Sequence, residues 1–277
     1  MESMITIGGD LSVPRLGFGA MRLCGPRVLG RPADDANAHA VLKRAVELGV
    51  ALIDTADAYG PHVNEEQIAE ALYPYPSGLL IASKCGSTRP EGRWVPNGRP
   101  EYLRSACEGS LKRLRLERID LYQLHSPDPH VPLAESIGAL GELQREGKIR
   151  HIGISNVGVT ELEEAQAVAP IASVQNEYNV GNRESEAVLE ACEREGVAFL
   201  PYFPIDGGDL AKSGGALARI AAAHGATPAQ VALAWLLARS PAIAPIPGTS
   251  SLAHLAENVA AARLELTQDE WDALDRG

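Results

Sequence analysis

Four residues of the types that transfer protons occur in the first half of the chain, as Asp54, Tyr59, Lys84 and His125. Tyrosine ordinarily titrates near pH 10, so it is a useful general acid at neutral pH only where its phenolate is stabilised. We expect Lys84 to reach the Tyr59 hydroxyl and to lower its pKa by about two or three units. Asp54 would hold Lys84 charged and oriented, and His125 would donate a hydrogen bond to a substrate carbonyl oxygen. These residues predict proton donation to a carbonyl, and no G-x-S-x-G elbow or Cys-His signature competes with that interpretation.

None of these side chains is a source of hydride, so a cofactor must supply it. The second half of the chain carries groups suited to hold one. Ser155, Asn156 and Gln175 offer a hydroxyl and amides that match a carboxamide, and Tyr202 offers an aromatic face for a flat ring. The segment 247–251, Pro-Gly-Thr-Ser-Ser, precedes a predicted helix and can present backbone N–H groups and hydroxyls to a phosphate.

Short apolar runs rich in β-forming residues alternate with amphipathic stretches of helical length along the whole chain. Eight rounds of this alternation predict parallel strands joined by helices. The expected strands are Leu16–Ala20, Ala51–Thr55, Leu79–Lys84, Ile119–His125, Ile149–Asn156, Ser173–Tyr178, Ala198–Phe203 and Ala244–Pro247. Helix starts are indicated at Asp34 and at Thr227-Pro228, which have the residue types of N-caps and of a first helical position.

Eight such units in 277 residues favour one α/β domain over residues 1–277, folded as a closed (β/α)8 TIM barrel. The alternative, an open doubly wound sheet, usually carries a G-x-G-x-x-G turn after its first strand. Here Gly17-Phe18-Gly19 lacks the third glycine. In a barrel the active site lies at the carboxyl ends of the strands, where the candidate residues above fall.

Composition limits the partners. The chain has 25 Lys and Arg against 36 Asp and Glu, a net charge of −11, so nucleic acid is excluded as a partner. Its four cysteines are scattered without a Cys-x-x-Cys pair, which predicts reduced thiols in a cytoplasmic protein and no metal site. We find neither a signal peptide nor an apolar stretch of membrane-spanning length. A small-molecule substrate is therefore expected, and nothing in the sequence sets the oligomeric state.

Residues 86–100 form the one predicted loop of unusual character, rich in Gly, Pro and Arg. It is either a lid over the substrate or an idle connection, and Trp94 within it either walls the substrate site or packs on the barrel. Substrate identity is carried by such loops and has no readable code here. Trp235, in the apolar run 231–237, is expected in the core.

The segments that contain these candidates resemble blocks of the aldo-keto reductase family, in the family's order, and the resemblance extends from Arg15 to Leu274. The blocks are 54–60, 83–84, 124–125, 153–156, 174–179 and 246–249. The resemblance implies a (β/α)8 barrel that binds NADPH in extended form, with Asp54, Tyr59, Lys84 and His125 as the catalytic set. It also assigns Ser155, Asn156 and Gln175 to the nicotinamide carboxamide and Tyr202 to stacking on the nicotinamide ring.

The same resemblance predicts where the adenosine 2′-phosphate binds. Many members of the family hold it with Lys and Arg where this chain has Gly248 and His254, whereas Thr249, Ser250, Glu257 and Asn258 match the rest of the motif. A weaker cationic grip makes NADH a possible cofactor beside NADPH. The short connection from Asp206 to Ala216 predicts a looser covering of the pyrophosphate.

Finer blocks at 59–63, 71–75 and 201–204 resemble the bacterial pyridoxal-reductase type within the family. We therefore expect a reductase that moves hydride from NADPH to an aldehyde or ketone while Tyr59 protonates the alkoxide, with pyridoxal as the first candidate substrate and small aromatic or aliphatic aldehydes as the second. The alternative is an NADPH-binding regulatory or sensor subunit with little turnover. A protein that binds NADPH yet oxidises it with no carbonyl compound would favour the sensor, and a structural scaffold would bind no nicotinamide at all.

Overall fold

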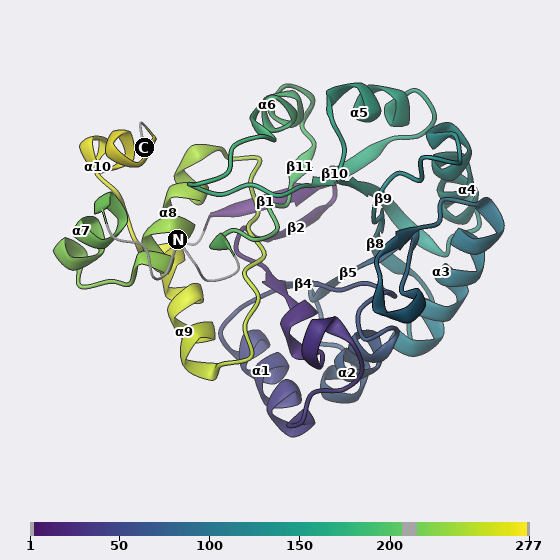
Figure 1. Cartoon of the computed structure of the whole chain (residues 1–277), viewed down its shortest axis with the longest axis horizontal. Helices are drawn as coiled ribbons and strands as arrows, with labels where there is room; N and C mark the ends of the chain where they lie inside the picture. The colour runs from purple at the N-terminus through teal and green to yellow at the C-terminus, as the bar shows by residue number, and fades with distance from the viewer. Residues whose placement is uncertain (1–2, 207–214, 276–277) are drawn as a thin grey trace.

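Seven parallel strands form the central sheet in the computed structural model, which describes residues 3–206 and 215–275 (Figure 1). Along the sheet the order is β11-β10-β9-β8-β5-β4-β3. Each strand of this sheet therefore pairs with the sheet strand that comes next in the sequence. Their bounds are β3 (Phe18–Gly19), β4 (Leu52–Asp54), β5 (Leu80–Cys85), β8 (Ile119–Leu124), β9 (Ile149–Ser155), β10 (Ile171–Gln175) and β11 (Ala198–Phe199). The first seven expected strands are therefore confirmed in position, although β3 and β11 are shorter than predicted.

Helices follow the strands and surround the sheet in Figure 1. They are α1 (Asp35–Glu47), α2 (Val63–Leu72), α3 (Pro100–Leu114), α4 (Leu133–Arg145), α5 (Val159–Gln166), α6 (Glu186–Glu195), α7 (Gly215–His224), α8 (Pro228–Arg239), α9 (Leu252–Ala260) and α10 (Gln268–Asp275). Both predicted helix starts are confirmed, because the Asp34 side chain accepts a hydrogen bond from the backbone N–H of Asn37 and the Thr227 side chain accepts one from the backbone N–H of Gln230. Within the described ranges, no individual helix has the length and apolar character needed to cross a bilayer.

The eighth expected strand, at 244–247, is not a regular strand in the structure. Residues 242–247 nevertheless bond to both edges of the sheet: the Ala244 amide donates to Phe199 in β11, and the carbonyls of Pro245 and Pro247 accept from Gly17 and Gly19. A parallel ladder also needs amides that donate in return. Proline has no N–H, so on the β3 side this segment can only accept hydrogen bonds.

Alternation along the strands divides the core into an interior cluster and a layer beneath the helices. Leu52, Leu80 and Leu121 face the interior, whereas Ile53 and Ile81 face the helices. An N-terminal hairpin that the sequence analysis did not predict, β1 (Met4–Ile7) with β2 (Leu11–Pro14), packs Ile5, Ile7 and Val13 into the interior cluster. The hairpin therefore fills one end of the space that the strands surround.

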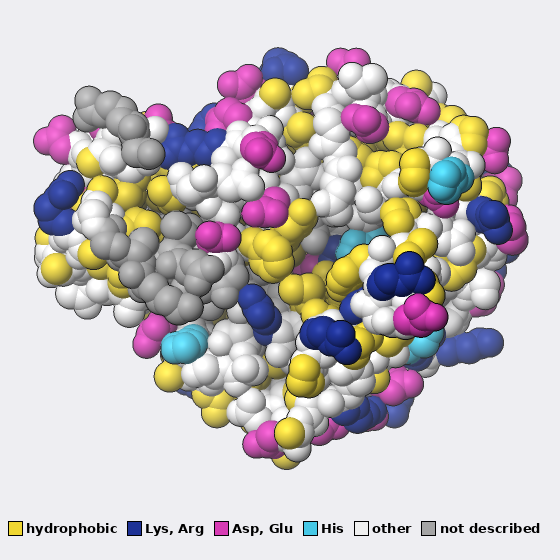
Figure 2. Space-filling view, viewed as in Figure 1, with side chains coloured by type: hydrophobic (Ala, Val, Ile, Leu, Met, Phe, Trp, Pro, Cys, Tyr) yellow, Lys and Arg dark blue, Asp and Glu magenta, His cyan; other side chains and the backbone are white. Residues whose placement is uncertain are grey.

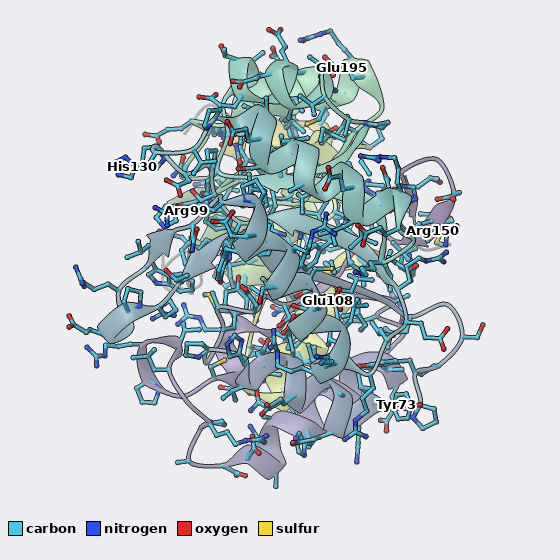
Figure 3. All side chains as sticks on the ribbon, turned by 90° about the vertical axis from the view of Figure 1, so that its right-hand side faces the viewer. Tyr73, Arg99, Glu108, His130, Arg150 and Glu195 are labelled. Carbon is cyan, nitrogen blue, oxygen red and sulfur yellow. The ribbon has the colours of Figure 1, made fainter. Side chains whose placement is uncertain are left out.

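The opposite end carries the loops that follow the carboxyl ends of the strands. Figure 3 shows Arg99 and His130, which follow β5 and β8, on one side of the molecule, and Arg150, at the start of β9, on the other. Residues 86–100 are more ordered than predicted, since β6 (Ser87–Thr88) pairs with β7 (Val95–Pro96) as a second hairpin. The predicted short connection between Asp206 and Ala216 lies largely outside the described residues.

Candidate active site

Strand alternation brings an acid and an ammonium together at the loop end of the interior. Asp54 lies two residues beyond Leu52 and Lys84 two beyond Ala82, so both side chains point inward above the apolar cluster. Lys84 Nζ donates to Asp54 Oδ1 at 2.5 Å, and both side chains are almost completely buried. Burial of a charged pair is tolerated only where both ions are paired and hydrogen-bonded, which is the case here.

Lys84 also connects the acid to the phenol. Its Nζ donates to the Thr55 carbonyl at 2.9 Å and to the Tyr59 hydroxyl oxygen at 3.4 Å. The prediction that Lys84 reaches Tyr59 is therefore confirmed. Because Lys84 is the donor, the Tyr59 O–H remains available to donate to a substrate.

The predicted lowering of the Tyr59 pKa is not found, although Lys84 lies where it was expected. Burial raises the pKa of Tyr59 well above its usual value, and the negative charge of Asp54 adds to the increase. Burial also lowers the pKa of Lys84, against the opposing pull of Asp54. Desolvation of a phenolate costs more than one shared ammonium returns, so Tyr59 is a neutral phenol that holds its proton.

His125 follows β8 and lies beside Tyr59, with 5.7 Å between the ring centres. Burial, Lys84 and Arg89 lower the pKa of His125 to about 3, so the imidazole is neutral. A neutral imidazole carries one N–H and can donate one hydrogen bond. The geometry fits the predicted hydrogen bond to a carbonyl oxygen that also accepts from Tyr59.

Trp94 stands over these two rings. Its ring centre is 6.2 Å from Tyr59 and 5.6 Å from His125, both in edge-on arrangements, and 46% of the residue is exposed. Of the two expectations for Trp94, the wall of the substrate site is the one that this position supports. Figure 2 shows this face of the molecule hollowed near its middle, with hydrophobic side chains around the hollow.

Arg89, which the sequence analysis missed, fixes Trp94. Its guanidinium carbon lies 3.8 Å from the centre of the Trp94 ring. The same guanidinium donates to the carbonyls of Arg27, Val28 and Gly92. Arg89 thus ties the 87–96 hairpin to the loop after β3, and the usable signal for it was the arginine-rich composition of residues 86–100.

The residues predicted for the carboxamide form one hydrogen-bonded group. Asn156 donates to the His125 carbonyl at 2.8 Å and accepts from the Tyr202 hydroxyl at 2.8 Å, and its backbone is left-handed with φ of +60°. Ser155 donates to the Gln175 carbonyl at 2.6 Å. Asn156 and Tyr202 therefore hold each other beside the catalytic set.

Gln175 and a further glutamine support the acid. Gln175 Nε2 donates to Asp54 Oδ2 at 2.8 Å, and Gln123 Nε2 donates to the same oxygen at 3.2 Å. Gln123 was not predicted, although its place two residues beyond the inward Leu121 was a usable signal. Both carboxylate oxygens of Asp54 therefore accept hydrogen bonds, Oδ1 from Lys84 and Oδ2 from the two glutamines.

The predicted phosphate residues gather at the start of α9, close to the end of β3. Ser251 caps this helix by accepting from the His254 amide, and its first turn has no acidic residue. A side chain at Gly248 would place its Cβ 2.5 Å from the Gly19 carbonyl oxygen, so only glycine fits there. Asn258 is buried, Thr249 and Glu257 are half-buried, and Ser250 and His254 are exposed.

These features define the class of protein. The Aldo/keto reductase family model matches residues 15–276, and the chain belongs to this family. It is 47% identical to the pyridoxine 4-dehydrogenase of Escherichia coli, over 96% of each chain. A thermostable aldo-keto reductase solved with the inhibitor epalrestat superposes with a TM-score of 0.88 and 34% identity, covering 99% of this chain and 98% of that one. An aldo/keto reductase from Klebsiella pneumoniae, solved with NADP and acetate, gives a TM-score of 0.86 and 27% identity over 100% and 95% of the two chains.

Proposed function

We propose that this protein reduces aldehydes or ketones with hydride from NADPH, and that Tyr59 is its general acid. The observation that carries the proposal is the buried chain from Asp54 through Lys84 to the Tyr59 oxygen, beside the His125 ring. An intact set of proton-handling groups favours an enzyme over the sensor subunit. The protein is an oxidoreductase of the aldo/keto reductase family.

Each residue has a defined part in the reaction. When bound, reduced nicotinamide supplies the hydride. His125 and Tyr59 donate hydrogen bonds to the carbonyl oxygen, and negative charge that develops there strengthens both bonds. Tyr59 then gives its proton to that oxygen, and the Lys84 ammonium stabilises the resulting phenolate. Asp54 keeps Lys84 charged and aimed at Tyr59.

We assign the nicotinamide carboxamide to Ser155, Asn156 and Gln175 and the ring to the face of Tyr202. The start of α9 suits the 2′-phosphate, since its free backbone amides and lack of acidic residues favour an anion. Thr249, Ser250 and His254 would lie next to it, and we assign Glu257 and Asn258, in the second half of α9, to the rest of the cofactor. Many family members have Lys and Arg where this chain has Gly248 and His254. We therefore expect this protein to prefer NADPH over NADH by a smaller margin than those members do.

Pyridoxal is the first substrate that we propose, because a pyridoxine dehydrogenase is among the relatives and Trp94 offers a flat wall to an aromatic aldehyde.

We also propose that residues 242–247 act as the eighth strand of a closed (β/α)8 barrel and that the whole chain is one domain. The cysteines of the described structure are all free, and a cytoplasmic location would keep them reduced.

Replacement of Tyr59 by Phe tests the mechanism. Removal of the acidic hydroxyl should lower kcat for pyridoxal reduction by at least about 100-fold, the usual minimum for loss of general acid catalysis, while the dissociation constant for NADPH stays within about twofold. NADPH oxidation at 340 nm measures the first quantity and protein fluorescence quenching the second. A Tyr59→Phe variant that keeps most of its rate would reject Tyr59 as the acid. Wild-type protein that binds NADPH but reduces no aldehyde or ketone would instead favour the sensor.

A further inference from the structure

A buried polar cluster that the reaction does not use lies behind the catalytic turn, between β5 and helices α2 and α3. Its members are Asp57, Glu65, Ser83, Tyr102 and Arg113. Asp57 and Glu65 are 1% and 0% exposed, respectively. Asp57 lies two residues before Tyr59 on the same turn. This turn therefore connects the cluster to the active site.

The charges of this region do not balance if every carboxyl group is ionised. Lys84 pairs with Asp54, and Arg113 Nε pairs with Glu65 at 2.7 Å, where Ser83 also donates to Glu65. Asp57 has no cation within ion-pair distance among the described residues, and its Oδ1 has no hydrogen-bond partner there. An ionised carboxylate with a buried, unpaired oxygen is costly, whereas a neutral carboxylic acid is far less so.

The hydrogen bonds of Tyr102 fit the same conclusion. Its hydroxyl lies 3.2 Å from Asp57 Oδ2 and 3.2 Å from the Ser87 carbonyl oxygen. The phenol has one proton, and the carbonyl can only accept. While Asp57 is ionised, that single proton is shared between the two acceptors; if Asp57 carries a proton and donates it to Tyr102, the Tyr102 hydroxyl donates to the Ser87 carbonyl alone.

Ser87 makes this arrangement important for the substrate. It begins β6, whose partner strand β7 directly follows Trp94. The Tyr102 hydroxyl therefore holds the base of the hairpin that sets Trp94 against Tyr59 and His125. Ser87 itself is 5% exposed, so its carbonyl has little water to replace a lost partner.

We propose that Asp57 is a positioning residue that acts as a neutral, buried carboxylic acid: it donates its proton to Tyr102, and Tyr102 in turn holds the Ser87 carbonyl and fixes the Trp94 hairpin. Ionisation of Asp57 turns the Tyr102 hydroxyl toward the carboxylate, and the hairpin loses this anchor. The substrate wall is thus fixed in one protonation state of Asp57 and loosened in the other. This inference rests on the proposed function only in calling Trp94 a substrate wall.

The direction of the pH dependence follows from the groups around Asp57. Burial and the charge of Glu65 raise the pKa of Asp57 to about 8, against the opposing effects of Tyr102, Arg113 and the backbone N–H of Ala58. The other titratable groups that face it are Tyr59 on its own turn, Lys84 and Cys85 on β5, and Tyr122 on β8. Burial raises the pKa values of Tyr102 and Tyr122, so neither phenol ionises in the same range. Asp57 is neutral below about pH 8 and ionised above it, and the anchor is lost as the pH rises.

The experiment compares KM for benzaldehyde, which has no ionisable group, between about pH 6 and about pH 10. In the wild type we expect KM to rise about fivefold to tenfold across about pH 8, the cost of one hydrogen bond, with a smaller change in kcat. Asp57→Asn keeps a neutral donor toward Tyr102, so its KM should remain low across the range. Tyr102→Phe removes the anchor, so its KM should be high at every pH.

Tyr75→Phe is the matched control. The Tyr75 hydroxyl donates to the carbonyl of Leu114, which lies at the opposite end of α3 from Tyr102. Its KM profile should follow that of the wild type. The proposal is overturned if Asp57→Asn retains the alkaline rise, or if Tyr102→Phe has the wild-type KM at neutral pH.

A second readout does not depend on turnover. Trp94 fluorescence, isolated by subtracting the spectrum of a Trp94→Phe variant, should change near pH 8 in the free wild-type protein and not in Tyr102→Phe. A flat titration of the wild type would contradict the proposal even if Asp57→Asn failed to fold. A transition in a protein without carbonyl reductase activity would support the anchor and reject only the proposed function.

Discussion

At the scale of single residues, the active site works through burial more than through charge attraction. Tyr59 and His125 both have pKa values shifted toward their neutral forms. Each therefore keeps an N–H or O–H to donate to a carbonyl oxygen over the ordinary pH range. The charged pair, Asp54 and Lys84, lies behind them, where it can stabilise the phenolate as it forms.

Titration of His125 should not contribute to the pH dependence of kcat/KM for reduction. Its pKa of about 3 means that it gains a proton only in strong acid, so kcat/KM for benzaldehyde should be flat between about pH 5 and about pH 7. His125→Gln, which keeps an N–H donor, should lower the rate about 10-fold to 100-fold without changing the shape of that profile. A wild-type limb near pH 6.5 that disappears in His125→Gln would contradict a neutral imidazole.

The sequence predicted which polar residues lie together but not their electrostatics. Residue type and position at strand ends were enough to bring Asp54, Tyr59, Lys84 and His125 together. The sign of the Tyr59 shift depends on how much water the folded chain removes, and no local pattern records that. Asp57 was overlooked for the same reason, because its lack of a cation becomes visible only when α2 and α3 are in place.

At the scale of elements, cap residues and apolar runs predicted the helix starts and seven strands. The 87–96 hairpin escaped prediction because its two strands have two residues each and little apolar pattern. The hairpin at 4–14 had a signal, two apolar runs around Gly8-Gly9, that was not used. The expected eighth strand is irregular for a physical reason, because prolines supply carbonyls without amides.

The 87–96 hairpin should set substrate preference. Trp94→Ala removes the aromatic wall, and we expect it to raise KM for benzaldehyde about tenfold while KM for propanal changes by less than about twofold, in line with the cost of a lost aromatic contact. Steady-state kinetics with both aldehydes measures the ratio. Val95→Ala, at an exposed neighbouring position, is the control. Equal losses for the two aldehydes would mean that Trp94 has no selective contact with aromatic rings.

At the scale of the whole molecule, the two ends of the interior that the strands surround have separate tasks. One end carries the candidate active site, and the other is filled by the N-terminal hairpin, which is held to β9 by ion pairs from Asp10 to Arg150 and His151. Stability and chemistry can therefore be changed independently. The apolar interior between the two ends keeps them apart.

Ile7→Ala tests this separation. Ile7 is fully buried in the interior cluster, so the substitution should lower the free energy of unfolding by about 2–5 kcal/mol, measured by urea denaturation. KM and kcat for benzaldehyde should remain within about twofold of the wild type below the melting temperature. Met4→Ala, on the exposed face of the same strand, should change neither quantity. A change in KM with Ile7→Ala would show that the two ends are coupled.

The one-sided join between 242–247 and β3 has a consequence for the cofactor. Fewer backbone bonds hold this join than a regular parallel pair would have, and the chain runs from it directly into the residues that we assign to the dinucleotide. A dinucleotide bound by those residues would add contacts beside this join and so stabilise it. Cells that run short of the dinucleotide would then hold a form of the enzyme that opens and is degraded more readily, so that supply of the reductant also governs how long the enzyme survives.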